Sequence, residues 1–253
     1  MAPVATTDAF GLQGKTILVT GASSGIGAAV AALCARLGAT LVVTGRNAER
    51  LQALADTLHG AGHVQVAGDL TDAHVRQSLL DAAGGYDGLA SCAGATAMVP
   101  FRMATEKHLQ QMLAINYLAP ITLTQQLLYK RRLREHASLV FVSALASRAA
   151  PQAATGYSAA KAALEAAVRT LALEHGRQGI RANCIAPGYV ETPMLDGLRQ
   201  TANIDNNIGL TPLGTVAAGD IAQAAVYLLS SASRWVTRSA LTIDGGISLM
   251  MRL

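Results

Sequence analysis

Apolar segments of strand length alternate with segments of helical periodicity along most of this 253-residue chain. This alternation limits the possible folds, because strands that are apolar on both faces need helices on both sides of their sheet. We therefore expect an α/β fold with a doubly wound parallel sheet. The expected strands are Thr16–Thr20, Thr40–Thr44, Val64–Ala67, Gly88–Ser91, Leu139–Ser143, Arg181–Ala186 and Ala240–Ile243. The expected helices span residues 25–37, 47–59, 72–83, 105–134, 154–175 and 219–230.

The length and the composition fit one large domain. Hydrophobic residues make up 51% of the chain and charged residues 14%, so there is enough apolar material to bury a core. No internal repeat or linker divides the chain. We predict a single domain over residues 1–253, with residues 1–13 as a loose N-terminal arm. Residues 193–213 are polar and interrupt the alternation, and their length predicts a substrate lid.

The charge and the cysteines argue against several classes of protein. The net charge is +4 and aromatic residues are 4%, and no basic patch with interleaved aromatics is present, so nucleic-acid binding is not indicated. Cys34, Cys92 and Cys184 are far apart in apolar surroundings, which indicates reduced thiols rather than a disulfide or a metal site. No signal peptide or apolar run of membrane-spanning length is present. We therefore expect a cytoplasmic protein with no membrane partner.

A glycine-rich turn follows the first expected strand and opens the first expected helix. Its glycines are Gly21, Gly25 and Gly27, with the spacing G-x-x-x-G-x-G. Gly21 permits a tight turn, Gly25 lets the backbone approach a pyrophosphate, and Gly27 lets the helix pack closely on the sheet. The helix N-terminus offers free N–H groups and a positive dipole end to the phosphates. A glycine turn without a ligand is the alternative, but the strand–turn–helix context favours a dinucleotide site.

Tyr157 and Lys161 lie four residues apart in a segment that is expected to be helical, so their side chains share one face. A phenol has a pKa of about 10, and a nearby cation favours the phenolate and lowers that pKa. The pair can therefore provide a general acid or base near neutral pH. Isolated pairs with this spacing also occur by chance, with the tyrosine packed and the lysine solvated, so the pair gains its meaning from the rest of the chain.

Together, the glycine turn and the Tyr157–Lys161 pair resemble the short-chain dehydrogenase/reductase family. The resemblance extends from about Gly14 to Gly246, and further family-like strings stand in the expected order. In chain order these contain Asp69-Leu70, Cys92-Ala93-Gly94, Asn116, Ser143, Pro187-Gly188, Thr192 and Asp244-Gly245-Gly246. The resemblance implies a Rossmann-like, doubly wound, seven-stranded and mostly parallel sheet with helices on both faces.

The resemblance also implies four catalytic residues. Tyr157 gives a proton to a carbonyl oxygen or takes one from an alcohol, and Ser143 holds that oxygen by a hydrogen bond. Lys161 lowers the pKa of Tyr157 and binds the nicotinamide ribose. Asn116 holds a water that passes protons toward Lys161. The hydride comes from the cofactor. No cluster of His and Cys has ligand spacing, so no metal is expected.

A dinucleotide site along the carboxyl ends of the strands is implied by the same resemblance. Its residues are Gly21, Ser23, Ser24, Gly25, Ile26, Gly27, Arg46, Asn47, Asp69, Leu70, Ala93, Gly94, Tyr157, Lys161, Pro187, Gly188, Val190 and Thr192. Two features depart from the family pattern. Ser91 and Cys92 replace the usual two asparagines. Ser143 precedes Tyr157 by 14 residues, where the family more often has one residue fewer, and Ser147 is the alternative to Ser143.

The end of the second expected strand favours NADP(H) over NAD(H). NAD-preferring sites carry an acidic side chain there, which accepts hydrogen bonds from the ribose hydroxyls and would repel a 2′-phosphate. This chain has Gly45 at that place, followed by Arg46, whose guanidinium can bind a phosphate through paired, charge-assisted bonds. Ser23 or Asn47 could add a hydrogen bond. In the alternative, Arg46 is a solvated residue at a helix start, where a cation opposes the dipole.

We therefore expect an NADP(H)-dependent oxidoreductase that interconverts a small-molecule ketone and a secondary alcohol. One alternative is reduction of a 3-oxoacyl group on an acyl carrier protein, which the basic run 130–134 could dock, although a solvated helix end is the favoured interpretation of that run. A dinucleotide-binding protein without catalysis, or another nucleotide-binding fold such as a methyltransferase, is disfavoured by Tyr157 and Lys161. We predict a homotetramer, or less readily a dimer. Helix 154–175 is apolar around much of its circumference and should be covered on more than the sheet side, with helix 105–134 as its partner across an interface. The apolar segment 247–251 should also be covered.

Overall fold

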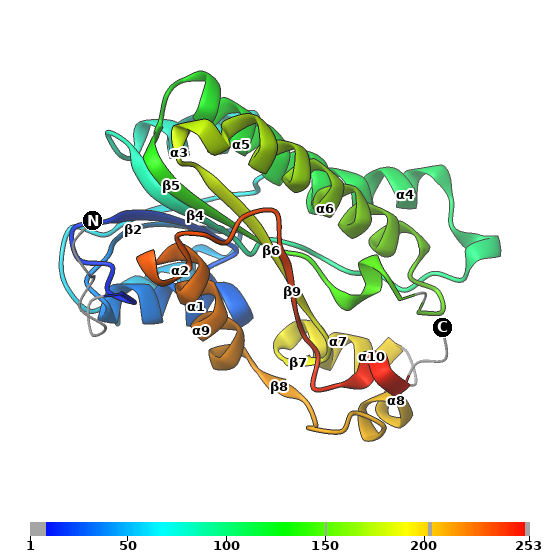
Figure 1. Ribbon diagram of the computed structural model, residues 1–253. Coiled ribbons are helices and arrows are strands. Elements are labelled where there is room, and N and C mark those ends of the chain that lie inside the picture. The colour runs from blue at the N-terminus through cyan, green and yellow to red at the C-terminus, as the bar shows by residue number, and fades with distance from the viewer. Residues whose placement is uncertain (1–8, 150, 202–203, 251–253) are drawn as a thin grey trace.

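The computed structural model describes residues 9–149, 151–201 and 204–250. A seven-stranded sheet runs through the molecule in the order β3-β2-β1-β4-β5-β6-β9 (Figure 1). Every pair of neighbouring strands in this sheet is parallel. The strands are β1 (Thr16–Thr20), β2 (Thr40–Gly45), β3 (Val64–Ala67), β4 (Tyr86–Ser91), β5 (Leu133–Val142), β6 (Arg181–Pro187) and β9 (Ala240–Ile243). The predicted Rossmann-like, doubly wound α/β fold is confirmed.

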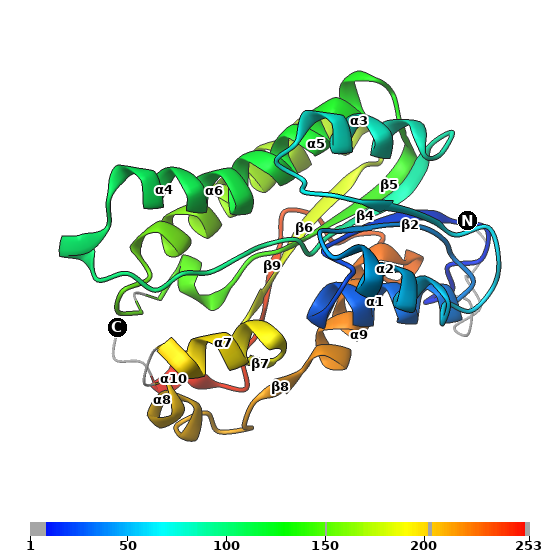
Figure 2. The same cartoon turned by 180° about the vertical axis from the view of Figure 1, so that it is seen from behind.

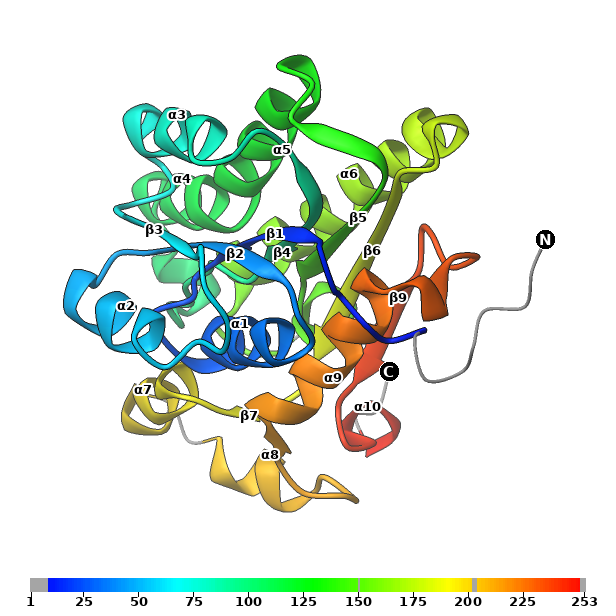
Figure 3. The same cartoon turned by 90° about the vertical axis from the view of Figure 1, so that its left-hand side faces the viewer.

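Helices cover both faces of the sheet (Figure 3). One face carries α1 (Gly25–Arg36), α2 (Ala48–Ala55) and α9 (Ala218–Leu229). The other face carries α3 (Ala73–Asp81), α4 (Glu106–Leu113), α5 (Ala119–Tyr129) and α6 (Thr155–His175). The same two helical layers are visible from behind in Figure 2.

Alternate residues of the central strands fill two separate cores. Ile17 and Val19 pack with α1 and α9, whereas Leu18 between them packs with α5 and α6 on the other face. All three side chains are fully buried. This arrangement follows because successive side chains of a strand point to opposite faces. The continuous apolar strands of the sequence therefore reflect two cores, one under each helical layer.

The predicted helix over residues 105–134 is wrong in its interior and at its end. It consists of α4, a π-helical turn over Ala114–Leu118, and α5, which ends at Tyr129. The chain then reverses at Arg131, whose φ is 53°, and enters β5 at Leu133, earlier than predicted. Pairing of β5 with β4 overrides the helical propensity of this segment. The basic run 130–134 accordingly lies in the turn before β5 and in its first residues.

The structure adds detail to the predicted N-terminal arm and to the predicted lid. Leu12 is fully buried, and its N–H donates to Leu37 O at 2.9 Å, so the predicted loose arm is wrong for residues 9–13. Residues 1–8 of that arm lie outside the described residues. The predicted lid contains α7 (Pro193–Thr201) and α8 (Asp205–Gly209).

Several short elements complete the described part of the chain. β7 (Val190–Glu191) pairs in parallel with β8 (Val216–Ala217) next to the lid. α10 (Ile247–Met250) follows β9 at the end of the molecule that also holds α8 (Figure 1). Short 3₁₀ helices span Phe101–Met103, Leu145–Ser147, Gly176–Gln178 and Ser231–Ser233. Within the described ranges, no helix combines the length and the apolar character that crossing a membrane requires.

Candidate active site

The carboxyl ends of the parallel strands meet at one edge of the sheet, and the strand order reverses there between β1 and β4. Ligands of open α/β sheets bind in the crevice outside this point. Two adjoining cavities occupy this edge. The turn cavity is lined by the glycine turn and by the ends of β2 and β3. The tyrosine cavity is lined by the loops after β4 and β5, by α6 and by the lid.

Close backbone contacts shape the glycine turn. Gly21 has a φ of 69°, and a Cβ on it would lie 2.7 Å from the backbone N of Ala93 at the end of β4. A Cβ on Gly27 would lie 2.3 Å from the carbonyl oxygen of Gly21. Only glycine avoids both the positive-φ strain and these clashes. The turn therefore forms a backbone cradle at the N-terminus of α1, in agreement with the expected tight turn and close packing.

Most of the residues expected to bind a dinucleotide line one of the two cavities. The turn cavity is lined by Gly21, Ser23, Ser24, Gly25, Ile26, Gly27, Arg46, Asp69, Leu70, Ala93, Gly94 and Thr192. The tyrosine cavity is lined by Ile26, Gly94, Tyr157, Lys161, Pro187, Gly188, Val190 and Thr192. Asn47 lines neither cavity. Its Oδ1 accepts a hydrogen bond from the N–H of Arg50 at 2.7 Å, so this side chain caps α2 instead of extending toward a cofactor.

The turn cavity contains a hydroxyl that the sequence did not single out. Thr44, near the end of β2, is buried and lines the cavity, and its Oγ1 has no hydrogen-bond partner among the described residues. A buried polar group without a partner lowers stability. The backbone cradle of the glycine turn, at the N-terminus of α1, is what fits the phosphates of a dinucleotide.

Gly45 ends β2 at a place where Ser23 fills the available space. A Cβ on Gly45 would lie 2.8 Å from both Cβ and Oγ of Ser23. Arg46 follows and lines the same cavity. The pKa of Asp69 opposite is lowered mainly by hydrogen bonds from Thr71, and the charge of Arg46 lowers it further. This end of the cavity therefore has a cation but no room for a carboxylate on β2.

Tyr157 and Lys161 lie on the same side of α6 and line the tyrosine cavity. The Nζ of Lys161 lies 5.7 Å from the centroid of the Tyr157 ring and donates to Val142 O at 2.8 Å. Burial raises the pKa of Tyr157 to about 12 and lowers the pKa of Lys161 to about 8. The expectation that Lys161 lowers the pKa of Tyr157 is therefore wrong for this structure, because burial dominates both groups. The phenol stays protonated at neutral pH.

Asn116 lies in the π-helical turn and is fully buried. Its Nδ2 donates to Ala95 O at 2.9 Å and to Met112 O at 3.0 Å, and its Oδ1 accepts from the N–H of Ala95 at 3.2 Å. Both donors of the amide are therefore used, while one lone pair of Oδ1 is left. A Cβ on Gly94 would lie 3.0 Å from Asn116 Oδ1 and 3.4 Å from Lys161 Nζ, so these two groups border the same space.

The two serines considered for holding the substrate oxygen both face Glu165. Ser143 Oγ donates to Glu165 Oε1 at 2.8 Å, and Ser147 Oγ donates to the same oxygen at 2.7 Å. Arg148 pairs with Oε2 of this carboxylate at 3.1 Å. A hydroxyl has one proton to donate, so in this arrangement neither serine has a proton left for a substrate. Ser143 also lines the tyrosine cavity, so the expected role of Ser143 in holding the substrate oxygen, with Ser147 as its alternative, stays a prediction.

The unusual spacing before Tyr157 has a simple explanation in this structure. With one residue fewer between serine and tyrosine, the oxygen-binding position falls on Ala144, which lines the cavity and has no hydroxyl. Sequence reasoning missed Glu165, although it stands four residues after Lys161 and is a carboxylate on an apolar helix face. Glu165 is only 5% exposed and anchors the loop after β5 to α6.

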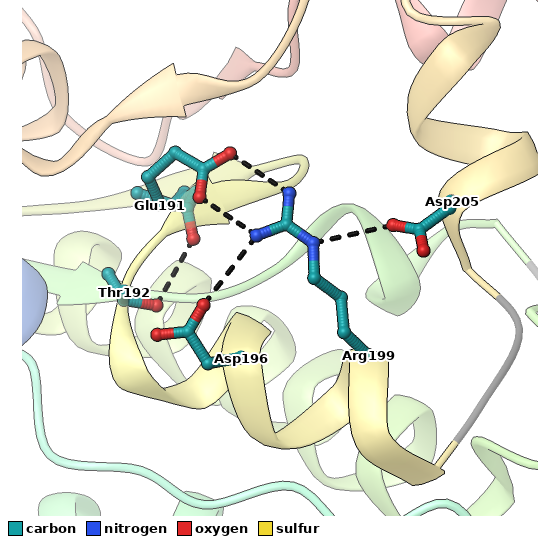
Figure 4. A network of polar contacts seen from close by, with 6 residues as sticks. Glu191, Thr192, Asp196, Arg199 and Asp205 are labelled. Carbon is teal, nitrogen blue, oxygen red and sulfur yellow. Dashed lines mark hydrogen bonds and ion pairs between the residues drawn. The ribbon is translucent and has the colours of Figure 1, made fainter.

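Arg199 of α7 joins the lid to its neighbours (Figure 4). Its guanidinium pairs with Glu191 of β7 at 3.1 Å, with Asp196 of α7 at 3.6 Å and with Asp205 of α8 at 3.4 Å. Leu195, on the same helix, is 3% exposed and lines the tyrosine cavity. The lid therefore places apolar side chains over the cavity and ion pairs on its other side.

Comparison with known proteins extends over nearly the whole chain. The model of a family described as enoyl-(acyl carrier protein) reductase matches residues 21–248. Oxidoreductase UcpA of Salmonella typhimurium is 32% identical over 253 residues, which cover 94% of this chain and 96% of that protein. The 3-oxoacyl-[acyl-carrier-protein] reductase FabG of Rickettsia prowazekii is 28% identical over 240 residues, which cover 94% and 99%.

The solved structures include close matches to the same fold. One described as a short chain dehydrogenase/reductase family protein has a TM-score of 0.83 and 34% sequence identity, and the match covers 94% of this chain and 99% of that one. The similarity therefore includes the sheet, both helical layers and the elements that line the two cavities.

Proposed function

The chain belongs to the short-chain dehydrogenase/reductase family and is an oxidoreductase that acts on CH–OH or keto groups. From this premise we propose that it is an NADP(H)-dependent enzyme that interconverts a ketone and a secondary alcohol. The observation that carries the proposal is the position of Tyr157 and Lys161. Both side chains line a cavity that adjoins the glycine cradle. A hydride donor held by the cradle and a proton donor on α6 thus border one space.

We assign proton transfer to Tyr157. In the reduction direction its phenol donates a proton to the carbonyl oxygen, and in the oxidation direction its phenolate accepts one from the alcohol. A pKa raised to about 12 by burial keeps the phenol protonated at neutral pH and so favours the donor role. A bound nicotinamide dinucleotide supplies or accepts the hydride.

Lys161 and Asn116 are proposed to support this proton transfer. The ammonium of Lys161 uses one donor on Val142 O and has two others for a ribose hydroxyl and for water. With a pKa of about 8, it is largely protonated at pH 7. The free lone pair of Asn116 Oδ1 borders the same space and would hold a water beside Lys161.

The cofactor preference is proposed from the end of β2. Arg46 provides a guanidinium for a 2′-phosphate, and Ser23 occupies the space that an acidic side chain at position 45 would need. Ser23 and Ser24 also bring hydroxyls to the cavity. These residues favour NADP(H), with NAD(H) as the weaker ligand. Asn47 is not included, because it caps α2.

A panel of ketones and secondary alcohols tests the proposal directly. Each compound is incubated with the enzyme and NADPH, NADH, NADP⁺ or NAD⁺, and the absorbance of the reduced nicotinamide is followed. We expect turnover of at least one ketone, faster with NADPH than with NADH. Binding of NADPH without turnover of any compound would favour the alternative of a dinucleotide-binding protein without catalysis.

Reduction of a 3-oxoacyl group on an acyl carrier protein is the second candidate, because the relative from Rickettsia prowazekii carries that name. The location of the basic run 130–134 weakens it. This run stands at the start of β5, whereas Val142 at the other end of the strand borders the tyrosine cavity. The two ends of β5 are about 30 Å apart at the usual rise per residue. A carrier docked on this run would therefore not lie at the cavity.

A further inference from the structure

We propose that the substrate of the tyrosine cavity is an uncharged, largely hydrocarbon ketone or the corresponding secondary alcohol. This inference rests on the proposed function of the same site and names its substrate class. It follows from the walls of the cavity, from the engagement of the nearby arginines, and from the charge of the lid.

The walls of the cavity are apolar on three sides. Met98 comes from the loop after β4, Leu145 from the loop after β5, and Leu195 and Ile204 from the lid. The cavity volume is about 190 Å³. Apolar cavities of about 150 Å³ bind ligands such as benzene. A bound nicotinamide would occupy the part of this space that the dinucleotide-binding residues line, so the apolar walls, rather than the whole volume, indicate a compact hydrocarbon body.

No cation is available to hold an anionic substrate. Among the described residues that line the cavity, Lys161 is the only one with a formal charge, and it is held by Val142 O beside the tyrosine. Arg148, on the loop after β5, is paired with the buried carboxylate of Glu165. A carboxylate or phosphate placed against the apolar walls would lose its hydration without a compensating partner, which is strongly unfavourable.

The lid adds a second obstacle for anions. Three carboxylates, those of Glu191, Asp196 and Asp205, surround the single guanidinium of Arg199 (Figure 4). None of these four residues lines the cavity, and the cluster therefore carries an excess of negative charge on the outer side of the lid. Fields of this kind repel ligands of the same sign and lower their association rates. A neutral substrate is not affected.

Three ketones of equal length separate charge from polarity. They are 2-octanone, 8-hydroxy-2-octanone and 7-oxooctanoate, which share the methyl ketone and differ only at the far end. We expect kcat/KM with NADPH to be highest for 2-octanone. The kcat/KM for the neutral hydroxyketone should be less than about tenfold lower than that for 2-octanone. The kcat/KM for the oxoacid should be about a hundredfold lower or more, because only the oxoacid brings an uncompensated charge. Equal kcat/KM values for 2-octanone and 7-oxooctanoate would overturn the inference.

A charge placed in the wall should change this order. Met98→Lys puts an ammonium on a chain of similar length into the cavity. We expect this variant to lower the ratio of kcat/KM for 2-octanone to kcat/KM for 7-oxooctanoate at least tenfold. Met98→Leu, which keeps the wall apolar, should keep the wild-type ratio. If both variants change the ratio equally, the wall does not select against charge and the inference fails.

A binding measurement separates failure of this inference from failure of the proposed function. 2-Octanone and 7-oxooctanoate are titrated by calorimetry into the enzyme with saturating NADP⁺. If none of the three ketones is reduced, the proposed function fails for them, yet tighter binding of 2-octanone than of the oxoacid still supports the neutral cavity. Tighter or equal binding of the oxoacid, or binding of neither compound, overturns the inference whatever the turnover.

Discussion

Ser23 and Gly45 determine which side chains the end of β2 can carry. In this chain the absence of an acid at position 45 is a packing requirement, because the Ser23 hydroxymethyl group stands 2.8 Å from where a Cβ would be. Cofactor preference therefore depends on two positions that are far apart in the sequence. Changing only one of them should not convert NADPH preference into NADH preference.

We expect Gly45→Asp to weaken the binding of NADPH about a hundredfold without strengthening the binding of NADH, since the new carboxylate contacts Ser23 and repels the 2′-phosphate. The double variant Ser23→Gly, Gly45→Asp removes that contact and should bind NADH more tightly than wild type does. Ser23→Gly alone should keep the preference for NADPH. Fluorescence titration of both cofactors measures these affinities, and tight NADH binding by Gly45→Asp alone would contradict the packing argument.

Ala144 stands where the usual family spacing would place the serine that binds the substrate oxygen. Both nearby serines donate to Glu165 in this structure, so a hydroxyl at position 144 would add a donor that is not already engaged by this carboxylate. Ala144→Ser should supply one and raise kcat about tenfold, the gain expected from one hydrogen bond to an oxygen that develops charge. Ala144→Cys is the matched control, of similar size but with a weak donor. Equal kcat for the Ser and Cys variants would show that no donor is missing.

At the scale of elements, features that depend on local sequence were easier to predict than features that depend on contacts between distant residues. The glycine turn and the Tyr157–Lys161 pair each depend on residues within one strand–turn–helix unit or one helix, so their spacing was enough to predict them. The partner of Ser143 lies 22 residues away on another element. A one-residue difference at the end of β5 decides whether a hydroxyl faces the cavity or Glu165, and spacing alone cannot show this.

The ends of elements were predicted least well, for a related reason. Residues 130–134 have good helical propensity, but pairing with β4 places them in a turn and a strand. Asn47 is compatible with both a ligand contact and a helix cap, and only the geometry of α2 decides for the cap. Leu12 is buried in the core that β1 shares with α1 and α9, which no local pattern near the N-terminus indicates.

Replacement of Arg199 tests how the lid is held. Replacing it by Gln removes three ion pairs, of which two join α7 to β7 and α8, so the closed lid should become less populated. We expect KM for the ketone to rise about threefold to tenfold, with kcat changed less than about twofold, as for a change in lid closure. Arg177→Gln, at an exposed position in the Gly176–Gln178 turn, is the control. A drop in kcat at unchanged KM would contradict this role.

The whole molecule exposes apolar groups that a monomer rarely leaves uncovered. Leu173 of α6 is 80% exposed and Tyr129 of α5 75% exposed, both in the helical layer opposite α1. A second group includes Trp235 and Leu249, each 84% exposed, before and after β9. These exposed apolar side chains support the proposal of a homotetramer, for which we propose two kinds of interface. Met251 of the predicted apolar end lies outside the described residues, and the cytoplasmic location stays a prediction.

Light scattering tests this assembly. Wild type should behave as a tetramer at micromolar concentration, and Leu173→Glu should shift it to a dimer, because a charge is placed in one interface while the other remains. Leu173→Met, which keeps the surface apolar, should remain tetrameric. A stable monomer for wild type would contradict the proposed assembly.

The central claim is that Tyr157 transfers the proton at a site next to the bound dinucleotide. Tyr157→Phe removes only the phenolic hydroxyl from a partly buried ring, so the fold and the turn cavity should be retained. The measurement is kcat for 2-octanone together with the dissociation constant for NADPH, on wild type and on the variant. We expect kcat to fall about a thousandfold or more, at the strong end of general acid–base effects, while NADPH affinity changes less than about threefold. A near-normal kcat would contradict the account.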